Sequence, residues 1–133
     1  MEAHIRASAA ALLAKLAYQV ALTSKRADPD TVHDLRVAIR RFSYCLRECS
    51  LFFAGKDVRK VRRRLRSLLE LSAAVRDRDI ALDLIKKSEL KSTTQLTTAL
   101  RKQREEAQEN LKRRVRRWSE RNFSKKWQTR LGL

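Results

Sequence analysis

Four nitrogen-donor side chains recur at helical spacing between residues 33 and 47. Wound at about 100° per residue, a helix brings His33, Arg36 and Arg40 within roughly 60° of one another, and Arg47 falls into the same basic stripe. Apolar side chains gather on another side of the segment, namely Leu35, Ile39, Phe42, Leu46 and Phe53. One face can therefore pack against other helices while the basic stripe faces a ligand that carries a row of negative oxygens.

The charge of the whole chain favours the same kind of ligand. The 133 residues include 32 Lys and Arg against 15 Asp and Glu, a net charge of +17, whereas small domains need only about 2–8 net charges for solubility. Residues 36–66 carry eleven Lys or Arg and two acids, and residues 101–133 carry twelve and four, so these stretches hold the whole excess. A polyanionic partner is the best explanation, whether nucleic acid, an anionic membrane surface or inorganic polyphosphate.

The elements that must position these residues are helices. Only two Gly and one Pro interrupt a composition rich in helix formers. We predict an all-α, antiparallel four- to five-helix bundle in one domain over residues 1–133, with helices at about 2–26, 29–53, 57–72, 77–87 and 93–121. Asp28 and Pro29 are typical of a helix start, Gly55 of a helix end, and Ser72–Val75 of a weak break. Trp118 belongs to an apolar seam of the last helix, whereas Trp127 is unassigned.

The basic residues of that last helix receive a different interpretation. Arg113, Arg114, Arg116 and Arg117 encircle the helix instead of lining one side, so we interpret them as solvated surface charges. The helix at 57–72 is different, because its basic side, which includes Arg62, can meet the basic stripe and form a continuous groove. A basic helix lying on a membrane surface is a weaker explanation, because the apolar side of 93–121 fits a protein core.

Cysteine usage and the N-terminus suggest a reducing interior. Cys45 and Cys49 lie beside the apolar face and are interpreted as small buried hydrophobes, because only His4 and His33 could complete a metal site. We therefore expect no metal and no cofactor. Lys15 interrupts the Ala-rich stretch 7–17, and no segment is expected to be long enough to span a bilayer. These features predict a cytoplasmic protein.

Several motifs in the order and spacing seen here resemble one helical family. They are Val32-His33-Asp34-Leu35-Arg36-Val37-Ala38-Ile39-Arg40-Arg41, Leu46-Arg47, Leu65-Arg66-Ser67-Leu68 and Val75-Arg76-Asp77-Arg78-Asp79-Ile80. Over residues 29–85 the chain resembles the CHAD domain, which is named for its conserved histidines. The last motif is similar to the family's pattern of Arg-Asp, one residue, Asp and an aliphatic residue.

The resemblance implies non-catalytic binding of inorganic polyphosphate, with attachment to polyphosphate granules as one cellular role. Carried over position by position, it implies phosphate contacts from His33, Arg36, Arg40, Arg41, Arg47 and Arg66, with Arg76 as a further contact. It gives Asp77 and Asp79 the role of orienting arginines or capping a helix. A phosphoryl-accepting His33 is disfavoured, because no glycine-rich phosphate loop or magnesium-binding cluster accompanies it.

Three departures from the family pattern affect these expectations. Ser43 stands where the family often carries another basic residue, and Ser72-Ala73 stands where Leu-Gly is usual. Family members commonly contain two helical units, whereas this sequence has one, so we expect either a homodimer or a half-domain with an open basic face. Nucleic-acid binding is the main alternative function, although an aromatic content of 6% offers no evident stacking platform.

Overall fold

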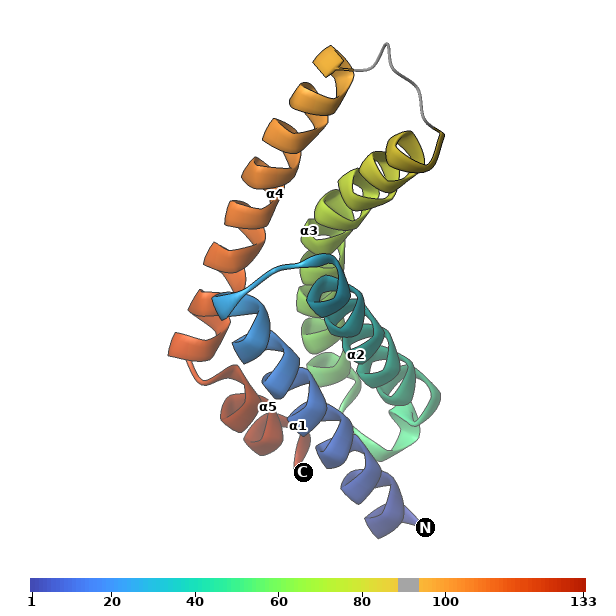
Figure 1. Ribbon diagram of the computed structural model, residues 1–133. Coiled ribbons are helices and arrows are strands. Elements are labelled where there is room, and N and C mark those ends of the chain that lie inside the picture. The colour runs from blue at the N-terminus through green and yellow to red at the C-terminus, as the bar shows by residue number, and fades with distance from the viewer. Residues whose placement is uncertain (89–93) are drawn as a thin grey trace.

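The computed structural model describes residues 1–88 and 94–133, and every regular element in these ranges is helical (Figure 1). The helices are α1 (Glu2–Lys25), α2 (Pro29–Glu48), a short 3-10 turn η1 (Ser50–Phe52), α3 (Gly55–Ser88), α4 (Thr94–Glu120) and α5 (Phe123–Leu131). The four long helices run in alternating directions, and α5 folds back at the end where the N-terminus lies (Figure 1). The predicted all-α class is confirmed.

The start of α2 is the one that the sequence predicts. Asp28 is its N-cap, and the carboxylate accepts a hydrogen bond of 2.8 Å from the backbone N–H of Thr31. This backbone hydrogen bond holds the pKa of Asp28 below its usual value. Pro29 follows as the first helical residue, where its missing N–H costs nothing.

The predicted end of α2 is wrong. The helix stops at Glu48, the chain turns through η1, and Gly55 begins α3 instead of capping α2. Phe53 lies in extended backbone after this turn, and its side chain is buried. The chain therefore leaves the helix early enough to return the Phe53 ring to the core.

The predicted break at Ser72–Val75 is also wrong, because α3 is a single helix of 34 residues. Ala73 and Ala74 are strong helix formers, and no Gly or Pro interrupts the segment. The Ser72 hydroxyl donates to the carbonyl of Leu69 at 2.7 Å, a bond made within the helix. The helix predicted separately at 77–87 is thus the second half of α3.

The core lies where α1 and α3 each pack against both α2 and α4. Its fully buried members include Leu13, Leu16, Leu35, Ile39, Phe42, Leu65, Leu68 and Leu111. The predicted apolar side of α2 therefore faces inward, which leaves the opposite side free for charged residues. Leu96, near the start of α4, is exposed and is not part of this core.

By length and composition, α1 is apolar enough to cross a membrane, and it is the one such helix among the described residues. The prediction that no segment has this length is therefore wrong. A core helix passes the same test, so a single instance is weak evidence. Here Leu13, Leu16 and Val20 are completely buried in the bundle, and α1 packs along α2 and α4, but only 22% of its most apolar stretch is buried.

The C-terminus closes one end of the bundle with aromatic side chains. Asn122 adopts a left-handed conformation, φ 49°, which reverses the chain between α4 and α5. Trp127, unassigned from the sequence, is buried and packs on Phe42, Trp118 and Phe123, with ring centroids 5.1–6.2 Å away. Arg6 of α1 donates to the carbonyls of Leu131 (2.9 Å) and Phe52 (2.7 Å). These hydrogen bonds connect the end of α5 and the turn η1 to α1.

Candidate functional site

A groove of about 250 Å³ runs between α2 and α3, and arginines from both helices line it. We call it the α2/α3 groove; its lining residues are Ile39, Arg40, Ser43, Tyr44, Arg47, Arg62, Leu65, Arg66 and Leu69. Four of these were predicted as binding residues: Arg40, Arg47, Arg62 and Arg66. No carboxylate lines the groove.

The groove arginines differ in how firmly they are held. Arg62 donates through Nε to the hydroxyl of Ser43 at 3.4 Å. Arg47 lies over the ring of Tyr44, 5.6 Å from its centroid, and pairs with Glu48 at 3.0 Å. Both members of that ion pair are about half exposed, so the pair neutralises Arg47 only weakly. Arg40 and Arg66 are exposed and make no hydrogen bond or ion pair to any described residue.

Arg36 belongs to the basic stripe, but its hydrogen bonds connect α2 to α3. Its guanidinium is half-buried and donates to the carbonyl of Leu69 and the hydroxyl of Ser72, both at 2.8 Å. Burial lowers the pKa of Arg36, with a smaller contribution in the same direction from Arg40. The guanidinium stays charged at neutral pH, and it joins α2 to α3 at Leu69, a residue that lines the α2/α3 groove.

His33 and Arg76 lie outside the α2/α3 groove. His33 is exposed near the start of α2, and Arg76 is half-buried on α3. Arg76 and Asp77 are close enough to Arg36 to act on its pKa in opposite directions, Asp77 raising it and Arg76 lowering it. The predicted contacts His33 and Arg76 are therefore not brought into the α2/α3 groove.

Arg41 does not join the other predicted contacts. On α2 it lies roughly 100° around the helix from the basic stripe, and it lines a different groove, of about 400 Å³, between α1 and α2. Lys15 and Asp34 share that groove, whose other lining residues are mostly apolar. The structure does not bring Arg41 together with Arg40, because adjacent residues of a helix point in different directions. A phosphate contact from Arg41 stays a prediction.

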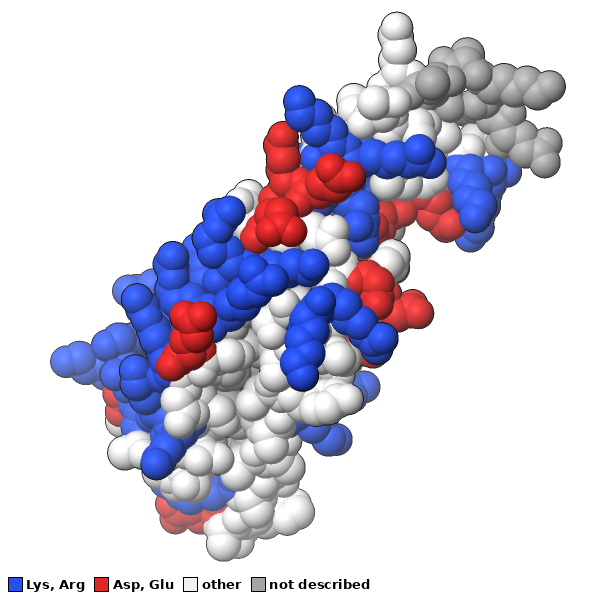
Figure 2. All heavy atoms as spheres, turned by 60° about the vertical axis from the view of Figure 1, so that its left-hand side comes forward, with Lys and Arg blue, Asp and Glu red and all other residues white. Residues whose placement is uncertain are grey.

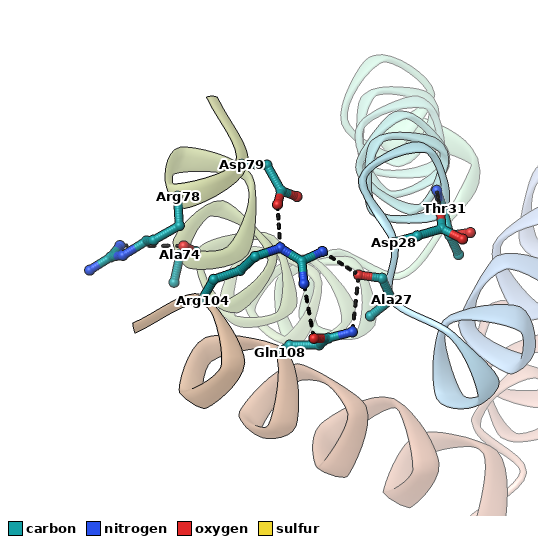
Figure 3. Close-up of polar contacts among 8 residues, drawn as sticks. All are labelled: Ala27, Asp28, Thr31, Ala74, Arg78, Asp79, Arg104 and Gln108. Atoms are coloured by element: carbon teal, nitrogen blue, oxygen red, sulfur yellow. Dashed lines mark hydrogen bonds and ion pairs between the residues drawn. The ribbon is translucent and has the colours of Figure 1, made fainter. Parts of the chain in front are cut away.

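Asp79 orients an arginine, one of the two roles expected for it. Its carboxylate, which is 6% exposed, accepts from Nε of Arg104 on α4. The same guanidinium bonds Gln108 (3.0 Å) and the carbonyl of Ala27 (3.3 Å), so one arginine links α3, α4 and the α1–α2 connection (Figure 3). The capping role expected as the alternative does not arise, because Asp79 lies inside α3.

The comparison with protein families agrees with this geometry. A family model described as the CHAD domain matches residues 7–132. The chain belongs to the CHAD family. The match extends well beyond residues 29–85 and takes in α1, α4 and α5. Comparison with curated proteins and with solved structures finds no match.

This CHAD domain also holds a groove residue that sequence reasoning missed. Tyr44 is 60% exposed and lines the α2/α3 groove. The helical spacing indicates this position, because Tyr44 falls within roughly 60° of Arg40 and Arg47 on a helical projection.

In the described part of the CHAD domain, no three His, Cys, Asp or Glu side chains come together as a metal site. Cys45 and Cys49 are half-buried free thiols.

Proposed function

We propose that the α2/α3 groove binds inorganic polyphosphate and that the protein makes and breaks no bond in it. The observation that carries the proposal is the convergence of Arg40, Arg47, Arg62 and Arg66 on one groove that no carboxylate lines. Membership of the CHAD family supports it, since the family resemblance implies this ligand.

The chemistry of the groove suits a ligand without bases. Polyphosphate is a flexible chain with about one charge per phosphate, and its recognition depends on guanidinium forks and ammonium groups placed along its path. Arg40 and Arg66 have their donors free for it. Arg62 is partly held by Ser43, which reduces the side-chain entropy lost on binding.

Replacing Arg40 and Arg66 together by Ala tests the proposal. Each charge-assisted hydrogen bond contributes about 1.5–3 kcal/mol, so the affinity for long-chain polyphosphate should fall at least about tenfold. Calorimetric titration at physiological salt measures it. Arg101→Ala with Lys102→Ala is the matched control, because this pair also removes two exposed positive charges and lines no described groove. Equal losses in both variants would mean that the groove is not the binding site.

Nucleic-acid binding is the second candidate, and Tyr44 is the observation that favours it. Its exposed ring in a basic groove offers a base a surface for stacking, although Arg47 already lies over this ring. If a single-stranded nucleic acid is the ligand, Tyr44→Leu should weaken its binding about tenfold, since one base stack contributes about 1–3 kcal/mol. If polyphosphate is the ligand, Tyr44→Leu leaves its affinity nearly unchanged.

We further propose a homodimer in the cytoplasm, associated with polyphosphate granules. The described residues form one helical unit, and two copies of it would restore the two-unit arrangement that the family resemblance implies. Sedimentation analysis with and without polyphosphate tests this assembly, and a strict monomer in both conditions would exclude it.

Co-localisation of a fluorescent fusion with stained polyphosphate tests the cellular location. A fusion that is never found at the granules would exclude that role.

A further inference from the structure

A second arginine-lined groove lies on the other flank of α3, where α3 meets the C-terminal half of α4. We call it the α3/α4 groove; its volume is about 180 Å³, and its lining residues are Arg64, Ser67, Arg114, Arg117, Trp118 and Arg121. None of these residues lines the α2/α3 groove. Arg64 lies about 160–200° around α3 from Arg62 and Arg66, so the two grooves face in different directions.

The positions of two of these arginines are fixed by the protein itself. Arg114 is half-buried and donates to the hydroxyl of Ser67 on α3 at 3.0 Å. Arg64 covers the ring of Trp118, 5.7 Å from its centroid. For Arg114, the interpretation as a solvated surface charge is therefore wrong. The prediction failed because the spacing within one helix does not reveal the serine that α3 supplies.

Nothing in the described part of the chain neutralises this groove. Its lining contains no carboxylate, and Arg64, Arg114, Arg117 and Arg121 form none of the ion pairs found among the described residues. Arg104, which is closer to the N-terminal end of α4, differs from them because it pairs with Asp79. The four positive charges that line this small groove repel one another, and a bound anion reduces that repulsion.

The surrounding surface reinforces the positive potential. Figure 2 looks onto the α4 side of the molecule and shows Lys and Arg gathered over the lower part of this face, below a group of acidic side chains. The acidic residues of α4 are Glu105, Glu106 and Glu109 near its middle, and Glu120 at its C-terminal end. The α3/α4 groove therefore lies beside a part of α4, residues 110–119, that carries basic residues and no acids.

We propose that the α3/α4 groove is a second anion site, which takes a short run of linked phosphate groups. Guanidinium forks match adjacent phosphates, and the small volume suits a short chain better than a long one. The site has no place for a base, because Trp118 is only 2% exposed and Arg64 covers it. The ligand is thus the phosphate chain itself, free or as part of a larger molecule.

Tripolyphosphate titrations in the Arg40→Ala, Arg66→Ala background test the proposal, because the α2/α3 groove is weakened there. Adding Arg117→Ala and Arg121→Ala should lower the remaining affinity about tenfold or more. Both side chains are exposed and make no hydrogen bond to a described residue, so the fold should persist. Arg113→Ala with Arg116→Ala is the matched control, since both are exposed arginines of the same helix outside the groove; it should change the affinity less than about threefold.

Each alternative outcome decides between the two sites. Equal losses in the test and control variants would mean diffuse attraction and would overturn the second site. Loss of all tripolyphosphate binding in the Arg40→Ala, Arg66→Ala protein would overturn it too, while leaving the α2/α3 proposal intact. Long-chain binding that survives Arg40→Ala, Arg66→Ala but is lost with Arg117→Ala, Arg121→Ala would support the second site and contradict the first. ATP should bind no more tightly than tripolyphosphate, and about tenfold tighter binding would contradict a site for the phosphate chain alone.

Discussion

Two serines in positions that depart from the family pattern hold arginines of the basic stripe and its groove. Ser43 accepts from Arg62, and Ser72 accepts from Arg36. A second basic residue in place of Ser43 would add charge to the groove, whereas the serine instead helps to position one already there. The Ser72 hydroxyl gives Arg36 a partner inside the helix pair, so these departures alter which arginines are free to meet a ligand.

Arg36→Ala should destabilise the fold, because it leaves the Leu69 carbonyl and the Ser72 hydroxyl without their partner. We expect the free energy of unfolding to fall by about 1–3 kcal/mol, measured by urea denaturation followed by circular dichroism. Arg40→Ala, one turn along the same stripe and free of hydrogen bonds, is the control and should change it by less than about 0.5 kcal/mol. An equally small effect of Arg36→Ala would refute its structural role.

The sequence predicts the direction of side chains within one helix better than their partners on another. The angular spacing correctly groups Arg40 with Arg47 and separates them from the buried side of α2. It cannot tell that Arg36 reaches the Leu69 carbonyl, because that contact depends on where α3 lies. The direction of Arg41 could be predicted, because it lies about 100° from Arg40 around the helix and therefore faces away from the stripe.

Among the elements, α3 has the central place because it contributes to both basic grooves. One flank carries Arg62 and Arg66 beside α2, and the opposite flank carries Arg64 and Ser67 beside α4. Farther along α3, Asp79 anchors Arg104 of α4 (Figure 3). Uninterrupted helix from Gly55 to Ser88 is what allows one element to fix all of these positions.

The Asp79–Arg104 contact should contribute measurably to stability. Asp79→Asn keeps the size of the side chain but removes the charge that faces Arg104, and we expect a loss of about 1–3 kcal/mol in the free energy of unfolding. Asp83→Asn, on the same helix, is the matched control, because its pair with Lys87 is exposed and should contribute at most about 0.5 kcal/mol. Urea denaturation of both variants compares them, and equal losses would argue against a specific role for Asp79.

Helix content followed from composition, but helix ends were predicted well only where a specific cap existed. Asp28 and Pro29 marked the start of α2 correctly because both act locally. The end of α2 depended on the need to bury Phe53, and the continuity of α3 depended on the absence of a strong helix breaker at Ser72–Val75. The docking of α5 could not be predicted, since the packing of Trp127 on Phe42 joins residues far apart in sequence.

Charge is distributed unevenly over the bundle. The excess of basic residues lies on α2, α3 and the later part of the chain. By contrast, half of the exposed residues of α1 are alanines, namely Ala3, Ala7, Ala11, Ala14 and Ala21. The uncharged surface in Figure 2 adjoins the basic face of α4. A net charge of +17 on so small a bundle opposes its compaction, and a bound polyanion should relieve that repulsion.

Polyphosphate should therefore stabilise the folded protein against heat. Binding to the native state alone raises stability by about 2.7 kcal/mol when the free ligand is at 100 times its Kd. We expect the Tm to rise with added long-chain polyphosphate, and to rise less at higher salt because the attraction is electrostatic. A Tm that does not respond to polyphosphate at low salt would contradict binding to the folded state.

Competition at fixed ionic strength shows whether the protein prefers polyphosphate to nucleic acid. Labelled long-chain polyphosphate bound to the protein is challenged with unlabelled polyphosphate, duplex DNA or single-stranded RNA at equal phosphate concentration. A groove built for a phosphate chain without bases predicts that unlabelled polyphosphate displaces the label at least about tenfold more effectively than either nucleic acid. Equal displacement per phosphate by nucleic acid would contradict the account and leave a basic helical bundle that binds polyanions without preference.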